Sequence, residues 1–328
     1  MSLDADTIVD RRRMRRKLTF WRVLAILIAI CAVVAVGVAL RAPGTGMLTE
    51  QAGRAIARVT ITGLIRSDQE RVEALDRLAK SRAPAVIVHI NSPGGTTAGS
   101  EQLYDSLMRL KEQKPLVVVV DGLAASGGYI TAIAADHIVA QETSLVGSIG
   151  VLFQYPNVTD LLKTLGIKVE EVKSSPLKAA PNGFEPTSPE ARAAIEAIVS
   201  DSYAWFRGLV KARRQLDDAD LERVADGRVF TGRQGVGLKL IDELGDERVA
   251  LAWLAKEKSI DPKTPVRDYR LRDRLSDLPF LHTAAITTLE AMGLSSFARR
   301  LEDWGAVQAI ERLNLDGLLV LWHPPIAN

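Results

Sequence analysis

A long apolar run near the start of the chain is its strongest hydropathy feature. Eighteen uncharged, almost wholly apolar residues extend from Val23 to Leu40. As a helix they would span roughly 27 Å at about 1.5 Å per residue, close to the hydrocarbon core of a bilayer. Six basic residues lie between Arg11 and Lys17, whereas only Arg41 follows closely. The positive-inside rule therefore predicts a membrane helix with a cytoplasmic amino terminus and an exported remainder.

A cleaved signal peptide is the alternative interpretation of this run. Its apolar stretch exceeds the usual length of about 7 to 15 residues, and no Ala-x-Ala cleavage site follows it. The pattern therefore favours an uncleaved anchor. The predicted organisation is a basic cytoplasmic tail (1–19), a transmembrane helix (20–40), a Pro- and Gly-containing linker (41–54), a globular domain (55–260) and a carboxyl-terminal extension without a recognisable motif (261–328).

Beyond residue 55, short apolar runs alternate with amphipathic stretches of helical period. The runs are rich in Val, Ile and Leu, which is typical of parallel strands that are buried on both faces. The pattern predicts an α/β domain with a mostly parallel, doubly covered sheet. The expected strands are 56–65, 85–90, 116–120, 137–140, 148–153 and 168–172, and the expected helices are 68–80, 98–111, 126–134, 158–165, 189–214 and 247–258.

Two of the predicted strands end in clusters of small residues. The strand 116–120 leads into a turn where Ser126 is surrounded by Ala and Gly, and the strand 85–90 leads into Asn91-Ser92-Pro93-Gly94-Gly95. A serine at such a strand-to-helix turn can present its hydroxyl to a cleft, which makes Ser126 a candidate nucleophile. The alternative is that the small residues only allow a helix to pack closely on the sheet.

Composition narrows the chemistry. The 42 Lys and Arg residues nearly balance the 40 Asp and Glu residues, so bulk charge gives no reason to expect nucleic acid as a partner. The single cysteine, Cys31, lies in the apolar run, which excludes disulfides and a cysteine nucleophile in the globular domain. The four histidines form no pair with metal-ligand spacing. We therefore expect no metal and no cofactor.

A serine nucleophile needs a base. His137 is a weak candidate, because its neighbour Asp136 would point to the opposite face of a strand, and His89 is expected to be packed or hydrogen-bonded in the core. Lysine can serve when burial keeps its amine neutral. Lys173 and Lys178 lie in the loop 173–188 and are the candidates, although either could be an ordinary surface lysine.

Several motifs occur in a fixed order and resemble the signal peptide peptidase A family. Members are membrane-anchored serine proteases related in fold to Clp protease and crotonases. The resemblance covers Ile56 to Lys258 and the anchor before it, and it implies a Clp protease/crotonase-like fold of repeated β-β-α units. The motifs are Asn91-Ser92-Pro93-Gly94-Gly95, Ala125-Ser126-Gly127-Gly128-Tyr129, Gly147-Ser148-Ile149-Gly150-Val151, Lys173-Ser174-Ser175-Pro176-Leu177-Lys178, and Gly227-Arg228-Val229-Phe230-Thr231-Gly232 with Gly237-Leu238 before Ile241-Asp242.

The resemblance also implies roles for individual residues. It implies a Ser–Lys dyad with Ser126 as nucleophile and Lys178 as general base, with Lys173 as the fallback for the base. Ser148 would hydrogen-bond the lysine, and the backbone N–H groups of Gly95 and Gly127 would form the oxyanion hole. Glycine suits both places, because there the backbone must approach the substrate closely.

Assembly and location follow from the same resemblance. The chain is similar to the short, single-repeat form, in which neighbouring subunits of a ring, here expected to be an octamer, complete each other's sites. The implied function is degradation of remnant signal peptides at the bacterial inner membrane, with the catalytic domain on the periplasmic side. Three alternatives are a peptidase that cuts a stomatin-like partner, a crotonase-like acyl-CoA enzyme and a non-catalytic scaffold. The apolar segment 315–322 could pack on a partner or on the membrane surface, or form a core strand or helix.

Overall fold

The computed structural model describes residues 21–22, 26, 55–271 and 318–321. The chain divides into two compact units, Met1–Gln51 and Ala52–Asn328, and the second contains the sheet. The predicted transmembrane helix (20–40) lies almost wholly outside the described residues. Where the structure describes the chain, no helix is both long enough and apolar enough to cross a bilayer.

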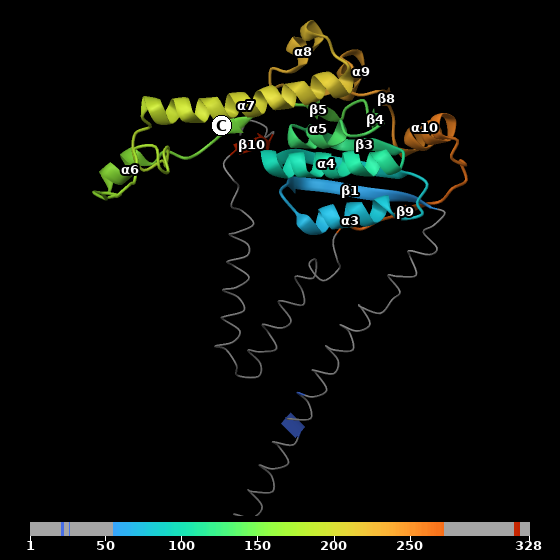
Figure 1. The fold of residues 1–328 in the computed structure, drawn as a ribbon, viewed down its shortest axis with the longest axis horizontal. Coiled ribbons are helices and arrows are strands. Elements are labelled where there is room, and N and C mark those ends of the chain that lie inside the picture. Colours follow the sequence, from blue (N-terminus) through green and yellow to red (C-terminus); the bar gives the residue numbers. More distant parts are fainter. Residues whose placement is uncertain (1–20, 23–25, 27–54, 272–317, 322–328) are drawn as a thin grey trace, which may run out of the picture. The chain divides into compact units, whose positions relative to one another are not determined.

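A ten-stranded mixed sheet forms the frame of the domain (Figure 1). Its main path runs β6-β10-β2-β3-β4-β8, while β1 joins β2 to β9 and β5 joins β3 to β7. Pairing is antiparallel in β2–β10, β6–β10 and β5–β7 and parallel in the rest. The strands are β1 Ile56–Ile65, β2 Val86–Thr96, β3 Leu116–Ala125, β4 His137–Ala140, β5 Leu145–Gly147, β6 Leu152–Phe153, β7 Val229–Thr231, β8 Glu243–Leu244, β9 Val266–Asp268 and β10 Leu318–Leu321.

All six predicted helices form in residues 55–271, whereas the two short helices 218–224 and 232–237 were not predicted. The longest, α7, begins after the N-cap Ser188 with Pro189 in its first turn and ends at Arg214, as predicted. The predicted helix 126–134 is shorter and begins one residue later. The helices are α3 Gln69–Ala79, α4 Thr97–Gln113, α5 Gly127–Ala132, α6 Thr159–Thr164, α7 Pro189–Arg214, α8 Asp218–Val224, α9 Gly232–Gly237 and α10 Glu247–Lys258.

Two predicted strands are wrong. Residues 168–172 form no strand, and all five are exposed, because this segment has no neighbouring strand to pair its backbone groups. The run 148–153 is interrupted, since Ser148 has a φ of 54°, which lies outside the region that strands adopt. Within this run only residues 152–153 form a strand, β6, while β5 ends at Gly147, just before the run begins.

Both faces of the sheet are covered at the amino-terminal halves of the central strands. On β2, alternate residues such as Val88 and Ile90 enter the larger core beneath α3, α4 and α5, while Ile87 enters a smaller core under α10. This alternation confirms the prediction of strands buried on both faces. The near-continuous valine run of β3 is its signature in the sequence.

The central strands are longer than predicted and change partners halfway. β3 pairs with β4 over residues 117–120 and with β5 over residues 123–125, and the pairing of β2 with β3 shifts register between Ile90 and Ser92. One long bent strand thus takes the place of the two consecutive strands of the predicted β-β-α unit. In β3, the carboxyl-terminal half leads into the small-residue turn at Ser126.

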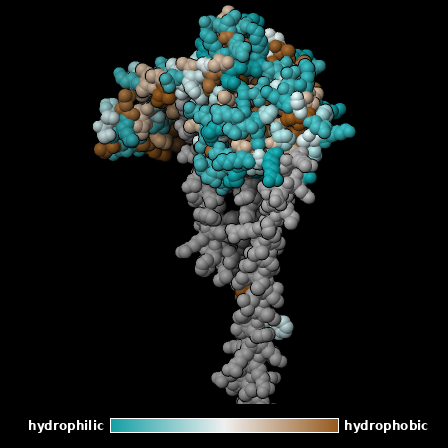
Figure 2. Space-filling model, turned by 45° about the vertical axis from the view of Figure 1, so that its right-hand side comes forward, coloured by the Kyte–Doolittle hydropathy of each residue, from teal (hydrophilic) through white to brown (hydrophobic). Residues whose placement is uncertain are grey.

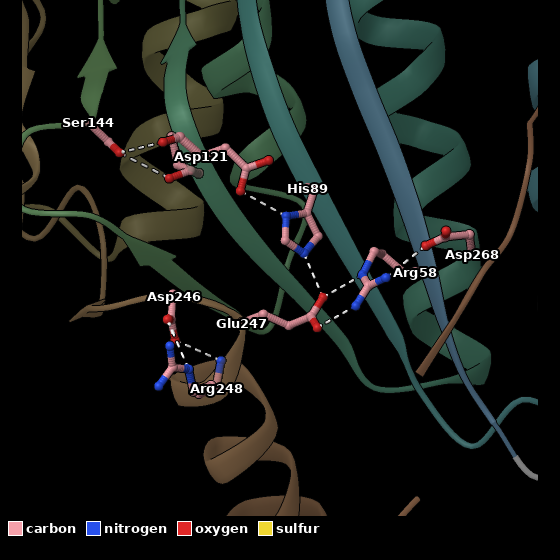
Figure 3. A network of polar contacts seen from close by, with 9 residues as sticks. Arg58, His89, Asp121, Ser144, Asp246, Glu247, Arg248 and Asp268 are labelled. Carbon is pink, nitrogen blue, oxygen red and sulfur yellow. Dashed lines mark hydrogen bonds and ion pairs between the residues drawn. The ribbon is translucent and has the colours of Figure 1, made fainter. Parts of the chain in front are cut away.

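A polar network lies on the sheet next to the start of α10 (Figure 3). The two ring nitrogens of His89 each lie 2.8 Å from a carboxylate oxygen, one of Asp121 and one of Glu247. Arg58 donates two hydrogen bonds of 2.6 Å to Glu247 and one of 2.8 Å to Asp268. These contacts, chiefly that with Arg58, hold the pKa of Glu247 below its ordinary value. The network ties the start of α10 to four strands, β1, β2, β3 and β9.

Candidate active site

Ser126 stands at the junction of β3 and α5 in a conformation that serine rarely adopts. Its φ is 54° and its ψ is −114°, which costs about 1 to 3 kcal/mol for a residue other than glycine. The surroundings hold it there. The Ser126 N–H donates to the carbonyl of Gly147 at 2.8 Å, and its own carbonyl accepts from the N–H groups of Tyr129 and Ile130 at 2.9 Å. Such imposed strain is typical of functional turns.

The Ser126 side chain is 1% exposed and does not cap the helix that follows. Among the described residues its hydroxyl makes no hydrogen bond, so it is not committed to a structural role. Tyr129 anchors the same turn, because its fully buried hydroxyl donates to the carbonyl of Leu240 at 2.8 Å. Burial raises the pKa of Tyr129 above its ordinary value, which keeps that hydroxyl protonated.

Ser148 lies beside Ser126 at the end of the neighbouring strand. Ala125 of β3 is paired with Gly147 of β5, so each serine directly follows a member of this pair. Ser148 also has a φ of 54°, is 7% exposed, and donates its N–H to the carbonyl of Arg228 at 2.8 Å. The structure thus brings together the predicted nucleophile and the serine predicted to support the base.

The two predicted oxyanion glycines, Gly95 and Gly127, lie on β2 and at the start of α5. Gly95 ends the paired stretch of β2 and β1, and a Cβ added to it would lie 1.7 Å from the carbonyl oxygen of Ile65, so only glycine fits. Gly127 is the first residue of α5, and its N–H has no acceptor within that helix. Gly95 thus lies near the end of β2 and Gly127 directly after Ser126; their role as oxyanion donors stays a prediction.

Lys178 lies elsewhere on the chain. It belongs to the loop between α6 and α7, its side chain is exposed, and among the described residues it makes no hydrogen bond or ion pair through its amine. Its N–H donates to the carbonyl of Ser175 at 3.1 Å. No hydrogen bond joins it to Ser126 or Ser148 within the described chain. The single chain therefore presents the nucleophile and the predicted base on separate elements.

Lys173, the fallback for the base, is bound by two carboxylates. Its amine lies 2.6 Å from Glu171 and 2.5 Å from Glu185. The hydrogen bonds to Glu171 and Glu185 raise the pKa of Lys173 above its ordinary value. A raised pKa keeps the amine charged, which is the wrong state for accepting a proton from a serine.

The segment that carries both lysines exposes many apolar side chains. We call residues 158–200 the arm; it comprises α6, the following loop and the first half of α7, and Figure 1 shows α6 beyond the amino-terminal end of α7. Brown surface gathers on this lobe in Figure 2. Monomeric proteins seldom expose so many large apolar residues in one segment. Eight of the twelve such residues in the described chain belong to the arm: Leu161, Leu165, Ile167, Val169, Val172, Leu177, Phe184 and Ile198.

The two histidines that the structure describes, His89 and His137, have structural partners instead of a serine. His89 is held between Asp121 and Glu247 (Figure 3). His137 stacks on Trp253 with ring centroids 4.8 Å apart, while Asp136 accepts a hydrogen bond from the Leu116 N–H. No histidine–carboxylate relay to Ser126 is present among the described residues, as expected from the sequence.

Comparison with known proteins gives a family for this arrangement. Peptidase family S49 matches residues 108–261, and Clp protease matches residues 59–144. A putative protease from Synechocystis sp. is 36% identical over 209 residues, covering 63% of this chain and 76% of the relative. The chain belongs to peptidase family S49. Membership of family S49 makes it a serine protease, that is, a hydrolase of peptide bonds.

Two further comparisons found weaker similarities. A putative signal peptide peptidase SppA from Enterococcus faecium is 31% identical over 200 residues, covering 60% of this chain but only 58% of the relative, less than two thirds of its length. A ClpP1 mutant from Listeria monocytogenes superposes with a TM-score of 0.40 at 15% identity, covering 62% of this chain and 95% of that one. Together with the Clp protease match, the mixed sheet confirms a Clp protease-like α/β fold for this S49 chain.

Sequence reasoning missed two features of this site. The pairing of Ala125 with Gly147, which places Ser148 beside Ser126, joins segments that the pattern treats separately. The strand β10 lies against β2, with Val320 opposite Gly95. The apolar segment 315–322 was the only signal for that strand, and one of the meanings considered for it, a core strand, is confirmed for residues 318–321.

Proposed function

We propose that the protein is a membrane-anchored endopeptidase that degrades remnant signal peptides with Ser126 as nucleophile and Lys178 as general base. Ser148 orients the lysine amine, and the N–H groups of Gly95 and Gly127 stabilise the oxyanion. The observation that carries this proposal is the meeting of three strand ends, those of β2, β3 and β5, around a buried serine in a strained turn. A protease of family S49 needs such a nucleophile.

Completion of the site by a neighbouring copy of the chain explains the position of the base. Lys178 is exposed in the single chain, whereas a lysine base must be buried to stay neutral. The apolar side chains of the arm supply a surface for association, and docking of the arm on a neighbour would bury Lys178 beside that neighbour's Ser126. A ring, with eight copies as the expected number, satisfies every arm in turn.

An extended peptide fits beside the glycines of β2. The chain itself places β10 there, antiparallel to β2 and β6, with Leu319 opposite Thr96 and Val320 opposite Gly95. Backbone pairing of this kind binds a strand whatever its side chains. A substrate in the same register would bring a carbonyl to the oxyanion donor, so we propose that the substrate peptide takes the place of β10.

The proposed location rests on the sequence of the amino-terminal segment. The apolar run 23–40 with basic residues before it is suited to a single-pass anchor in the bacterial inner membrane, which would place the catalytic domain on the periplasmic side. Remnant signal peptides lie in that membrane after export, so an anchored protease would meet them there. Cell fractionation, with a reporter fused after residue 328, checks both location and orientation.

The test uses the full chain in detergent with a synthetic signal peptide as substrate. Ser126→Ala should lower kcat by at least about 10³-fold, because no other group replaces the nucleophile. Ser106→Ala, which alters a buried serine of α4 bonded to the carbonyl of Gln102, is the control and should keep its activity. Full activity in Ser126→Ala would refute the proposed nucleophile. Cleavage of soluble proteins but not of signal peptides would refute the substrate.

Mixing two inactive variants tests completion between copies. Ser126→Ala and Lys178→Ala chains, combined before assembly, should regain activity, since some sites then pair an intact Ser126 with an intact Lys178 from its neighbour. Mixed assemblies that form but stay inactive would show that both residues act within one chain.

A further inference from the structure

Ser92 is a fully buried residue of the elbow Asn91–Gly95. Its hydroxyl bonds to one backbone group of β1 and to one backbone group of the elbow itself. The residue is 0% exposed. Its hydroxyl donates to the carbonyl of Gly63 at 2.7 Å and accepts from the N–H of Gly94 at 3.1 Å. A single side chain thus links β1 to the peptide that precedes Gly95.

The strands are irregular at this point on both sides of β2. The pairing with β1 shifts between Thr62 and Leu64, and the pairing with β3 shifts between Ile90 and Ser92. Ladder hydrogen bonds are locally interrupted at such bulges. The hydroxyl of Ser92 bonds to backbone groups of Gly63 and Gly94 at this irregular stretch, so a side chain helps to hold the turn that leads to Gly95.

Ser92 also touches the other elbow. A Cβ added to Gly128 would lie 2.6 Å from the carbonyl oxygen of Ser92 and 3.3 Å from its Cβ. Gly128 is the second residue of α5, two positions after Ser126. The backbone of Ser92 is therefore packed directly against the turn that carries the nucleophile.

We propose that Ser92 is a positioning residue that fixes the oxyanion donor of Gly95 relative to Ser126. Its hydroxyl holds the Gly94 peptide, and with it the direction of the adjacent Gly95 N–H, while its backbone bears on the helix start at Gly128. The inference rests on the proposed roles of Ser126 and Gly95. The roles proposed for the dyad and for the two glycines include none for Ser92, and this inference gives it one.

A misdirected oxyanion donor has a specific kinetic signature. The charge that Gly95 stabilises develops only in the transition state, so its displacement lowers kcat and leaves KM nearly unchanged. Removal of a whole donor costs about 10²- to 10³-fold in kcat. Because Ser92→Ala would displace the donor without removing it, we expect a loss of roughly 10- to 100-fold.

Two variants separate the hydrogen bonds from packing. Ser92→Ala removes the hydroxyl, while Ser92→Cys keeps a side chain of similar size but makes weak hydrogen bonds. Ser106→Ala is the matched control, since Ser106 is also a buried serine with a hydroxyl bonded to a backbone carbonyl. Each full-length variant is assayed for kcat and KM on the signal peptide, for the thermal midpoint, and for the inhibition constant of a peptide aldehyde, whose adduct with Ser126 places an oxyanion in the hole.

The proposal expects both Ser92 variants to lose kcat and to bind the aldehyde correspondingly more weakly, with KM within about twofold of the wild type. Ser106→Ala should show a similar change of thermal midpoint without these kinetic effects. Unchanged kcat in folded Ser92→Ala overturns the proposal, and so does a wild-type kcat in Ser92→Cys. If Ser126→Ala itself stays active, the proposed nucleophile fails, which is a separate outcome from the failure of Ser92.

Discussion

The surroundings of Ser126 and the arm differ in how far a single chain buries their side chains and bonds their polar groups. Around Ser126 the backbone groups are bonded, the side chains are buried, and two serines are held at a φ of 54° by neighbouring strands. In the arm, apolar side chains face outward and Lys178 makes no polar contact through its amine among the described residues. Among the described residues, the chain buries and bonds the first region by itself, whereas the second exposes its apolar side chains.

This difference separates two physical demands of Ser–Lys chemistry. A nucleophile and its oxyanion donors need fixed geometry, which a parallel sheet provides at its strand ends. A lysine base needs a dry environment that makes its charged form unfavourable. Burial by a second copy would couple activity to assembly, so that an unassembled chain would carry a shaped site without a functioning base.

The largest expected effect separates the two lysines of the arm. Lys178→Ala should lower kcat by about 10²- to 10⁴-fold, the usual contribution of a general base, and should abolish the rise of activity toward alkaline pH that a lysine base produces. Lys173→Ala should keep most of the activity, because the carboxylates of Glu171 and Glu185 hold that amine in its charged form. The readouts are kcat and its pH profile on a peptide substrate.

Ion pairing of Lys173 still organises the loop, so its loss can reduce activity modestly. A matched control is Lys163→Ala in α6, which removes an exposed lysine paired with Asp160. Loss of activity in Lys173→Ala together with full activity in Lys178→Ala would move the base to Lys173 and remove the contrast between a free and a paired lysine.

The apolar surface of the arm offers the next largest effect. Leu161→Asp combined with Leu165→Asp places one charge on α6 and one on the residue that follows it, both exposed. The two charges should prevent docking on a neighbour and lower specific activity by roughly 10- to 100-fold, since a buried unpaired charge is costly. Light scattering should show smaller assemblies. Val236→Asp, on an exposed apolar residue of α9, should leave both properties unchanged. An active, fully assembled double variant would exclude α6 from the interface.

Much of this contrast could be predicted from the sequence, and the reasons are local. The valine run of β3 indicates a buried strand, and the glycines after Ser126 indicate a tight turn, both within one short segment. The start of α7 is indicated by the N-cap Ser188 and by Pro189 in the first turn. The motif order was sufficient to identify the family. The pattern also located Ser126 at the turn after the valine run, where it follows the end of β3, whereas Ser148, expected to begin a strand, follows the end of β5; the catalytic roles of both serines remain predictions.

The rest depends on contacts between distant segments. Nothing near residue 168 shows that its alternating pattern lacks a neighbouring strand, so the predicted strand 168–172 was wrong. The network of Arg58, His89 and Glu247 joins residues up to 189 positions apart. Likewise, pairing of β10 with β2 links residues 320 and 95. A pattern read along the chain does not contain such pairings.

A smaller effect, a gain in apparent affinity for the substrate, is expected from a change in β10, the strand that pairs with β2 at Gly95. Val320→Pro removes a backbone donor from β10 and should weaken its pairing with Gly95. If β10 fills the peptide slot in most molecules, its release should lower KM by up to about 10-fold, because the apparent affinity scales with the open fraction. The measurement is KM for the signal peptide, with Ala327→Pro as control. An unchanged or higher KM would show that β10 does not compete with substrate.

The smallest effect is on stability and concerns the polar network around Glu247 at the start of α10. Glu247→Gln keeps the shape of the side chain but removes the charge that binds Arg58 and His89. The pKa of Glu247 is lowered in the folded protein, so its contribution to stability is complete above the ordinary pKa of 4.5 and is lost as the pH falls through the folded value. We expect the free energy of unfolding at pH 7 to fall by about 1 to 2 kcal/mol. The difference from the wild type should shrink at acidic pH, with kcat unchanged.

Glu73→Gln, in the exposed pair with Arg77, should cost less than about 0.5 kcal/mol. A Glu247→Gln difference that stays constant in denaturant titrations from pH 7 to pH 3 would mean that packing, and not the ionised carboxylate, carries the contribution of this residue.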